Sequence, residues 1–334
     1  MIKDQITTDN YTIINSDCMY VLPSLEDKSI DFSVYSPPFA GLYQYSSSEN
    51  DFSNCDTKEQ FLEQYEFLVQ QIARVTKPGR ITAVHCADVI SRDFDNEVIK
   101  EHMEGLWDFP NEIIRIHEKH GLRYRNKITT WKEPLKVRMR TMVRSLMHKL
   151  IVEDSTECFT AMPDYVLLFK KRGENQVPVT HPLGFSEYFG STPLLPEMEE
   201  KYGSLEMLKK KYSGWKDPKT NKLSHIIWQR YASSVWDDIR IDNVLPFKDS
   251  KDEDDEKHVH PLQLDVIDRL VELYTNPGEV VLTPFMGVGS EVYSPVSLGR
   301  KAIGIELKES YYKQAILNLK EAQNRFKKTQ TQLF

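Results

Sequence analysis

The strongest constraint on the fold is the alternation of strand-like and helix-like segments at both ends of the chain. "YTIINSD" and "IDFSVY" have the alternating apolar pattern of strands, and "TKEQFLEQYEFLVQQIARV" has the period of an amphipathic helix. We expect Thr57 to cap this helix with Gln60 as its partner, and Lys77-Pro78-Gly79 to end it. "RITAVHC", "RNKITTWK" and "DYVLLFKK" are three further strands. This alternation predicts an α/β fold with a mostly parallel, doubly wound sheet.

The alternation is interrupted once, between residues 172 and 257. Turn-forming residues fill "QVPVTHPLGFSEYFGSTPLLP", and "KDSKDEDDEK" is a charged run, so we expect an irregular insertion that ends in a mobile acidic linker. From Pro261 the pattern returns with a helix that carries this proline in its first turn, a strand, a glycine loop, a helix and a strand. We therefore divide the chain into residues 1–171, 172–257 and 258–334.

Composition excludes several classes of protein. No run of about 18 apolar residues is present, and "MIKDQITTDN" has no apolar signal core, which predicts a cytoplasmic protein without a membrane partner. The four cysteines (Cys18, Cys55, Cys86 and Cys158) lack C-x-x-C spacing, which favours reduced thiols over a disulfide frame or a zinc site. The histidine pairs 117/120 and 258/260 have no further ligands nearby, so no metal site is predicted.

Charge is unevenly distributed along the chain. The net charge of −7 argues against a protein that coats nucleic acid indiscriminately. Residues 115–149, however, carry eleven Lys and Arg against two acids. This stretch is either an ordinary solvated face or a phosphate-binding patch on an acidic body, and the sequence leaves both interpretations open.

A candidate cofactor site lies in "VVLTPFMGVGSEVYSPVSLGRKAIGIE". A strand enters a loop with Gly287 and Gly289, a helix follows, and a second strand ends at Glu306, 17 residues after Gly289. Glycines let the backbone approach a ligand closely, and an acid at the strand end can accept from both hydroxyls of a ribose. The full G-x-G-x-x-G of a dinucleotide site is missing because residue 292 is Val. The segment therefore predicts an adenosyl ligand without a pyrophosphate, and S-adenosyl-L-methionine fits that description.

Several segments, in order, resemble the amino-group DNA methyltransferases. The glycine loop resembles the D-P-F-x-G-x-G-T of that family, and Ser36-Pro37-Pro38-Phe39 resembles its catalytic [DNS]-P-P-[YFW] motif. "NSDCMYVLPSLEDKSIDFSVYSPPF" resembles the block before that motif, "IARVTKPGRITAVH" the block after it, and "VHPLQLDVIDRL" the helix that enters the cofactor site. The resemblance covers about residues 1–170 and 258–320. With the catalytic motif first and the cofactor loop last, the order is that of the permuted β class.

The resemblance implies a Rossmann-like S-adenosylmethionine-dependent sheet, circularly permuted, with residues 172–257 as an inserted target-recognition region. It implies double-stranded DNA as partner, and allows a cognate restriction endonuclease and a second copy of the chain. The cofactor-binding residues it implies are Asp17, His260, Pro261, Thr283, Phe285, Gly287, Gly289, Ser290 and Glu306. The DNA-binding candidates are Tyr43, Arg123, Arg125, Lys127, Arg138, Arg140 and Arg144.

The Ser-Pro-Pro-Phe motif can be interpreted chemically. On its own, a proline pair simply ends a strand, because proline donates no ladder hydrogen bond. The Ser36 hydroxyl and the Pro37 carbonyl can accept the two hydrogens of an exocyclic amino group, which exposes the nitrogen lone pair to a methyl donor. Phe39, after the stiff Pro37-Pro38 pair, offers a flat face to a flipped base. Methylation at cytosine C5 is disfavoured, because no cysteine follows a proline.

Three further questions remain open in the sequence. In the resembling family, Ser in the first motif position is associated mostly with cytosine N4, with adenine N6 as the alternative. Thr283 and Ser290 stand where Asp and Thr are usual, and loss of one charge-assisted contact costs about 1.5–3 kcal/mol. Weak cofactor binding is therefore predicted, and a catalytically inactive DNA-binding relative is the alternative of another class. Trp236 in "SVWDDI" is either part of the recognition region or a core residue.

Overall fold

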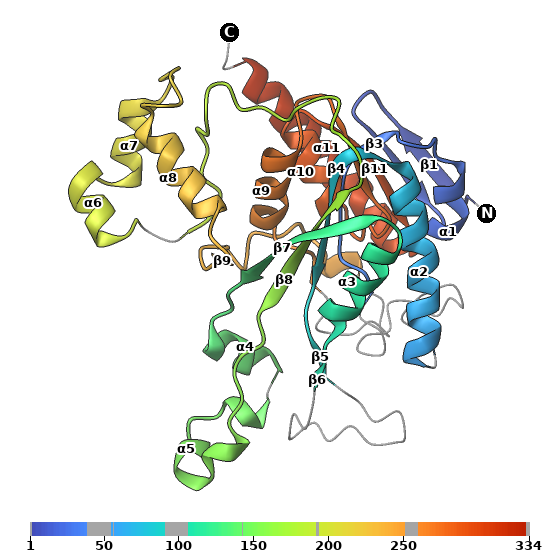
Figure 1. Cartoon of the computed structure of the whole chain (residues 1–334), viewed down its shortest axis with the longest axis horizontal. Helices are drawn as coiled ribbons and strands as arrows, with labels where there is room; N and C mark the ends of the chain where they lie inside the picture. Colours follow the sequence, from blue (N-terminus) through green and yellow to red (C-terminus); the bar gives the residue numbers. More distant parts are fainter. Residues whose placement is uncertain are drawn as a thin grey trace.

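The computed structural model describes residues 2–38, 55, 57–90, 106–141, 143–191, 194–250 and 260–331. Its centre is a nine-stranded sheet with the order β1-β2-β11-β10-β3-β4-β8-β7-β9 (Figure 1). Its strands are β1 (Asp4–Thr7), β2 (Tyr11–Asn15), β3 (Ile30–Tyr35), β4 (Thr76–Cys86), β7 (Leu122–Thr130), β8 (Asp164–Lys171), β9 (Val235–Trp236), β10 (Val280–Thr283) and β11 (Lys301–Glu306). Only the pairs β1–β2, β4–β8 and β7–β8 are antiparallel among these neighbours, so the prediction of a mostly parallel α/β sheet is confirmed.

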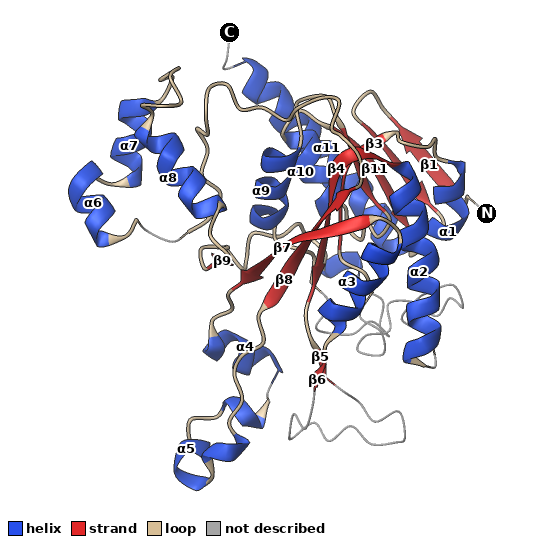
Figure 2. Ribbon diagram, in the orientation of Figure 1, coloured by secondary structure: helices blue, strands red, loops and turns tan. Residues whose placement is uncertain are grey.

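Helices cover both faces of this sheet (Figure 2). One core cluster joins the sheet to α1 (Cys18–Val21), α2 (Lys58–Val75) and α3 (Phe109–Lys119). A second cluster joins its other face to α9 (Leu264–Tyr274), α10 (Ser290–Ser297) and α11 (Glu309–Thr331). A short ribbon of β5 (Val89–Ile90) and β6 (Leu106–Trp107) follows β4. Within the described ranges, no helix is long and apolar enough to cross a membrane.

Helix α2 shows how the sequence sets one of these elements. The Thr57 side chain accepts from the Gln60 N–H at 3.2 Å, as predicted, and the apolar face of the helix is buried against the sheet. The prediction that Lys77-Pro78-Gly79 ends the helix is wrong, because α2 ends at Val75 and those three residues already belong to β4. Thr76 is extended and pairs with Ile30, and a register shift in the β3–β4 pairing accommodates the additional residues.

Helix α9 also begins later than the sequence indicated. It starts at Leu264 with Gln263 as its N-cap, so Pro261 precedes the helix and is not in its first turn. The Leu264 N–H donates to the Asn243 carbonyl at 2.8 Å, which fixes the chain in an extended conformation before the helix. Pro261 therefore lies in the segment that leads to the helix.

The insertion is more regular than its composition indicated. It contains α6 (Pro196–Tyr202), α7 (Leu205–Tyr212) and α8 (Lys222–Tyr231), which surround a small core of their own. The turn-forming segment before Pro196 has no helix or strand in its described residues, as expected, whereas Ser204 and Asn221 cap α7 and α8, so the expectation of an irregular insertion is wrong for residues 196–231. Residues 251–257 of the acidic run lie outside the described residues.

A buried arginine joins the insertion to the sheet domain. Arg269 of α9 is fully buried and forms an ion pair with Asp238 at 2.7 Å. Its guanidinium also lies over the rings of Tyr231 and Trp236, 5.2 and 5.1 Å from their centroids. Trp236 is buried in the main core, as one of the two interpretations of the sequence held.

The direction of the chain connections defines one special place in the sheet. Strands β10 and β3 are parallel neighbours, with Val281 opposite Phe32 and Leu282 opposite Ser33. From β10 the chain crosses to β11 on one side, whereas from β3 it crosses to β4 on the other side. Crossovers that diverge in this way leave a crevice at the carboxyl ends of the two strands, and ligands of open α/β sheets bind there.

Candidate active site

The two motifs singled out in the sequence meet at this crevice. Ser36 follows β3, and Thr283 is the last residue of β10. Between them, Tyr35 packs edge-to-face against Phe285 of the glycine loop, with ring centroids 6.1 Å apart. Residues that are about 250 positions apart in the chain thus form one edge of the sheet.

Ser36 is held by a side chain that the sequence reading did not single out. Its Oγ lies 2.9 Å from Nδ1 of His85, near the end of β4. The β3–β4 register, with Tyr35 opposite Val84, sets the two residues side by side. Pro37 is buried and Pro38 half-buried. Two further predicted residues, Phe39 and Tyr43, lie outside the described residues.

The contact continues beyond His85. Its Nε2 lies 3.3 Å from Oδ2 of Asp164, and Oδ1 of Asp164 accepts from the Lys132 ammonium at 2.5 Å. Asp164 opens β8, and Lys132 follows β7 two residues after Thr130, which pairs with Asp164. Burial alone would raise the pKa of the Asp164 carboxyl, but Lys132 and His85 outweigh burial and hold that pKa well below its usual range. Asp164 is therefore a buried carboxylate.

The glycine loop leaves its backbone open at one position. Gly287 has a φ of +53°, and a Cβ placed on it would meet no atom within 4 Å. Its N–H donates to Oε2 of Glu306 at 2.7 Å, which fixes the loop to the end of β11. By contrast, Gly289, with a φ of +99°, packs closely enough for a Cβ to lie 3.2 Å from that of Ala315. A ligand can thus approach the backbone of Gly287 closely, whereas the absence of a side chain at Gly289 lets the loop pack on α11.

Two acids stand at the same edge. The pairing of β2 with β11 sets Asn15 opposite Glu306, and Asp17 follows two residues later, where it caps α1 by accepting from the Met19 N–H at 2.8 Å. Burial, together with the charges of Asp17 and Glu306, raises the pKa of the Cys18 thiol. Both predicted acids are therefore close enough to act on one buried thiol, beside the Gly287 loop.

Two buried hydroxyls at this edge have no partner in the described structure. Thr283 is fully buried and Ser290 nearly so, and neither Thr283 Oγ1 nor Ser290 Oγ makes a hydrogen bond there. A buried hydroxyl without a partner costs free energy, so a ligand that hydrogen-bonds to either hydroxyl would recover that cost. With the open face of Gly287 and the carboxylate of Glu306, these hydroxyls fit a small polar ligand that bears a nucleoside.

The remaining predicted cofactor residues lie before α9. His260 is exposed, and its ring centroid is 5.1 Å from that of Phe247. Pro261 is half-buried. The structure thus places this pair at the entrance to α9, which packs against the cofactor-loop helix α10.

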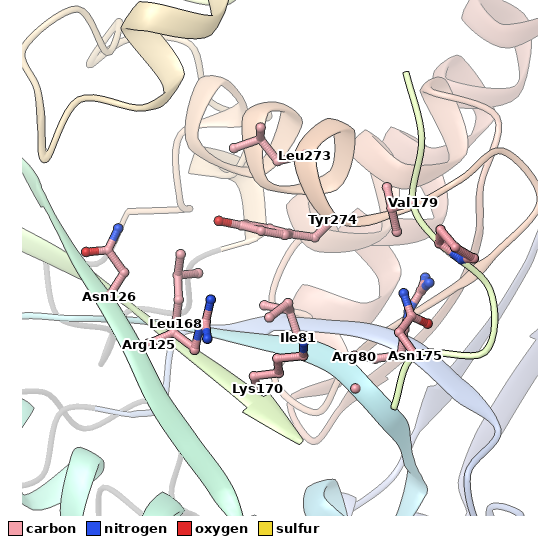
Figure 3. Close-up of a pocket in the computed structure, with 12 residues that line it drawn as sticks. Arg80, Ile81, Arg125, Asn126, Leu168, Lys170, Asn175, Val179, Leu273 and Tyr274 are labelled. Carbon is pink, nitrogen blue, oxygen red and sulfur yellow. The ribbon is translucent and has the colours of Figure 1, made fainter. Parts of the chain in front are cut away.

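The basic stretch is not gathered on one face. Arg123 and Arg125 lie near the amino end of β7, away from Ser36. Arg125 lines a pocket of about 570 Å³ together with Arg80, Lys170 and Tyr274 (Figure 3). Arg80 and Arg125 lie toward the amino ends of β4 and β7, so this pocket is at the opposite end of these strands from Ser36. Lys127 instead lies over the ring of Tyr165, 4.3 Å from its centroid.

The other basic residues lie on an arm between β7 and β8 that extends beyond the end of the sheet (Figure 1). The arm contains α4 (Pro134–Thr141) and α5 (Leu150–Glu153). Arg138 is on α4, and Arg144 lies 4.0 Å from Glu153. Arg140 is also on α4, but its side chain lies outside the described part. The arm follows the carboxyl end of β7, so it leaves the sheet on the side of Ser36.

His85, Asp164 and Lys132 are the site residues that the sequence interpretation missed. Each stands at or just beyond a strand end, in "RITAVHC", "DYVLLFKK" and "TTWK". A polar group where an apolar strand ends was the available signal. Their proximity, however, depends on the pairing of β3, β4, β8 and β7, which no local pattern specifies. The described ranges contain no cluster of three or more His, Cys, Asp or Glu side chains that could hold a metal ion.

The fold and this edge define a class: α/β proteins that bind a nucleoside-containing ligand where β3 and β10 end. Comparison with known proteins gives the family. The model of a DNA methylase family that covers N6 and N4 enzymes matches residues 30–317, and the chain belongs to that family.

Individual methyltransferases are similar to this chain at 13–24% sequence identity. The type II methyltransferase M.BamHI of Bacillus amyloliquefaciens is 24% identical over 309 residues, which are 92% of this chain and 56% of that protein. The chain thus spans a little over half the length of this relative. The putative DNA modification methylase TTHA0409 of Thermus thermophilus, complexed with S-adenosyl-L-methionine, has a TM-score of 0.57 at 19% identity over 92% of this chain and 93% of its own. The PvuII cytosine-N4-specific DNA methyltransferase has a TM-score of 0.58 at 13% identity over 98% and 95%. Both structures share the fold.

Proposed function

We propose that this protein transfers a methyl group from S-adenosyl-L-methionine to an exocyclic amino group of a base in double-stranded DNA. The observation that carries the proposal is the meeting of the Ser36 motif and the Gly287 loop at the ends of adjacent parallel strands. Family membership supports DNA as the substrate class. The order of these motifs in the chain supports the permuted arrangement, and residues 172–257 occupy the place of a target-recognition region.

The residues at the edge fit the cofactor. Glu306 accepts from the Gly287 and Lys308 N–H groups, and it would also accept from ribose hydroxyls, since a carboxylate oxygen can accept more than one hydrogen bond. Asp17 would reach the adenine, and the Thr283 and Ser290 hydroxyls would bind the polar end of the ligand. When bound, the cofactor supplies an electrophilic methyl group on a sulfonium.

On the catalytic side, groups of the protein itself bind the target amino group. The Ser36 hydroxyl and the Pro37 carbonyl accept the two hydrogens of the amino group, and they hold the nitrogen so that its lone pair points away from the base plane. A base would reach these groups only after it leaves the helical stack, because Ser36 is half-buried and Pro37 is buried at the end of β3. Direct displacement then needs no nucleophilic side chain.

We propose cytosine N4 as the acceptor, on the association of Ser in the first motif position with that base. Adenine N6 on the same scaffold is the second candidate, because the family covers both amino groups.

The test uses labelled cofactor. The purified protein is incubated with methyl-tritiated S-adenosylmethionine at high concentration and long mixed-sequence duplex DNA, which is then digested to nucleosides. Label on N4-methyldeoxycytidine is the expected result. Label on N6-methyldeoxyadenosine would retain the mechanism and change the base. Absence of label from DNA that contains many different sequences would contradict the proposed activity and favour a relative that binds DNA without modifying it.

A further inference from the structure

A chain of four polar side chains begins at the candidate catalytic serine. Ser36 Oγ contacts His85 Nδ1 at 2.9 Å, His85 Nε2 contacts Asp164 at 3.3 Å, and Asp164 contacts Lys132 at 2.5 Å. The His85 and Asp164 side chains are each 11% exposed. Contacts this well shielded from water are electrostatically stronger than exposed ones.

We propose that His85, oriented by Asp164, is a positioning residue that commits the Ser36 hydroxyl to accept a hydrogen from the target amino group. This inference rests on the proposed function and adds to it three residues and a route for a proton. It follows from which atom of each pair can donate.

The donor and acceptor roles follow from Asp164. Its carboxylate is ionised and can only accept, so the His85 nitrogen that faces it, Nε2, carries the hydrogen. In the neutral ring, Nδ1 then has a free lone pair and must accept the Ser36 hydroxyl hydrogen. The donor capacity of Ser36 is thereby used inside the protein. Both lone pairs of its oxygen remain for the substrate.

This arrangement matters because of the chemistry of the base. The exocyclic amino group of cytosine or adenine stands next to a ring nitrogen that accepts hydrogen bonds. A freely rotating serine hydroxyl could donate to that ring nitrogen, and so withdraw electron density from the amino group it should activate. A hydroxyl whose hydrogen points to His85 cannot do so. The histidine therefore selects the productive orientation of Ser36.

The same contacts provide a route for the proton that the reaction releases. When the amino nitrogen forms its bond to the methyl carbon, the carbon–sulfur bond breaks and its electron pair stays on sulfur. One N–H proton then passes to Ser36 Oγ while the Ser36 proton passes to His85 Nδ1, and the N–H electron pair remains on nitrogen. The imidazolium that forms lies against the Asp164 carboxylate and later returns its proton to water. Lys132 fixes the other oxygen of that carboxylate.

The first test needs no activity. Two-bond proton–nitrogen spectra of the full chain with nitrogen-15-labelled histidine resolve the tautomer of each ring, and His85→Asn assigns the His85 signals. We expect the Nε2–H tautomer for His85, and a shift of its Nδ1 resonance when Ser36→Ala removes the hydroxyl. An Nδ1–H tautomer, or an Nδ1 resonance that Ser36→Ala leaves unchanged, would overturn the proposal.

The second test separates positioning from general structural damage. Single-turnover methyl transfer is measured for Ser36→Ala, His85→Leu and the double variant, with unchanged cofactor affinity as the check on folding. His85→Leu should slow transfer about 10- to 100-fold, but it should slow the Ser36→Ala background less than about twofold, because His85 acts through Ser36. His85→Asn, which can place an amide oxygen near the Nδ1 position, should recover at least about tenfold over His85→Leu, as expected for a restored acceptor.

A control variant and two contradicting outcomes complete this test. His120, which contacts Glu66 on the surface, gives the matched control His120→Asn, which should leave the transfer rate unchanged. If the rate of the double variant is reduced by the product of the reductions in His85→Leu and Ser36→Ala, the inference is overturned and His85 has a structural role. If the wild-type protein transfers no label, the proposed function fails, and the spectra still decide whether His85 holds the Ser36 hydroxyl.

Discussion

Hydroxyl groups on the two sides of one crevice are treated in opposite ways by this protein. On the catalytic side, Ser36 is hydrogen-bonded into a network that ends at Lys132. On the cofactor side, the buried hydroxyls of Thr283 and Ser290 have no partner in the described structure. The Ser36 hydroxyl is thus oriented by other side chains of the protein, whereas the Thr283 and Ser290 hydroxyls can hydrogen-bond to a ligand.

The two sides also differ in their charge. Asp164 on the catalytic side is ionised far below neutral pH because Lys132 and His85 stabilise its charge. Glu291, in the first turn of the helix after the cofactor loop, is buried without such a cation, and burial together with Glu306 raises its pKa to about 8. One side therefore holds a stabilised carboxylate, and the other holds a carboxyl group that stays protonated near neutral pH.

Among these variants, Ser36→Ala should change the protein's activity most, and it should affect the catalytic side alone. Ser36→Ala removes the acceptor and leaves His85 Nδ1 without its partner, so single-turnover transfer should fall about 100- to 1000-fold. Binding of S-adenosylmethionine and of DNA, measured by calorimetry and by fluorescence anisotropy, should stay within about twofold because the cofactor side is intact. Transfer at the wild-type rate would remove Ser36 from the mechanism.

The pH dependence of the free energy of unfolding should distinguish the carboxyl groups of Glu291 and Asp164, with a smaller effect. The folded-state pKa of Glu291 lies above its unfolded value of 4.5, so the free energy of unfolding should decrease as pH rises from about 4.5 to about 8. Between pH 6 and 8 the decrease from this group is about 2–3 kcal/mol. In urea melts, Glu291→Gln should lack this decrease. Parallel pH curves for wild type and variant would show that Glu291 is not buried as a neutral acid. Asp164 contributes nothing in this range, because its stabilisation is lost only in acid.

The smallest effect compares two buried threonines. Thr283→Val removes an unpartnered hydroxyl and should raise the free energy of unfolding of the ligand-free protein by about 1 kcal/mol. Thr275 is equally buried, but its hydroxyl donates to the Val271 carbonyl and accepts from Arg300. The matched change Thr275→Val should lower the free energy of unfolding by about 1–3 kcal/mol. Equal signs for the two variants would mean that Thr283 has a partner in the free protein.

Local sequence patterns predicted the parts of this molecule that depend on local physics. The Thr57 cap, the strand "DYVLLFKK" and the succession of strand, glycine loop, helix, strand and acid all lie where the sequence indicated. In each of these, capping, alternation or glycine conformation acts within a few residues. The candidate cofactor edge could therefore be predicted before the fold was known.

The rest depends on contacts between distant segments. The network from Ser36 to Lys132 requires the register of β3, β4, β8 and β7, and the residues in each contact are dozens of positions apart. Only the part of the insertion from Pro196 to Tyr231 differs from the prediction, because cap residues such as Ser204 and Asn221 are the same residue types that form loops. The basic stretch was one feature in the sequence, but the register shift of the β7–β8 pairing between Tyr124 and Asn126 makes Arg125 an extra residue in the strand. Arg125 and Lys127 therefore lie in different surroundings, although regular alternation would put them on the same face.

We expect a nucleoside-bearing cofactor to bind against the open face of Gly287. Calorimetric titration of S-adenosylmethionine into wild type, Gly287→Asn and Gly278→Asn tests it most directly, since asparagine tolerates a positive φ. Gly278 is the matched control, with a φ of +79° and equally open space, at the other end of β10. We expect Gly287→Asn to weaken binding more than about tenfold, or about 1.4 kcal/mol, and Gly278→Asn to leave it unchanged. Equal affinity for all three proteins would contradict the account.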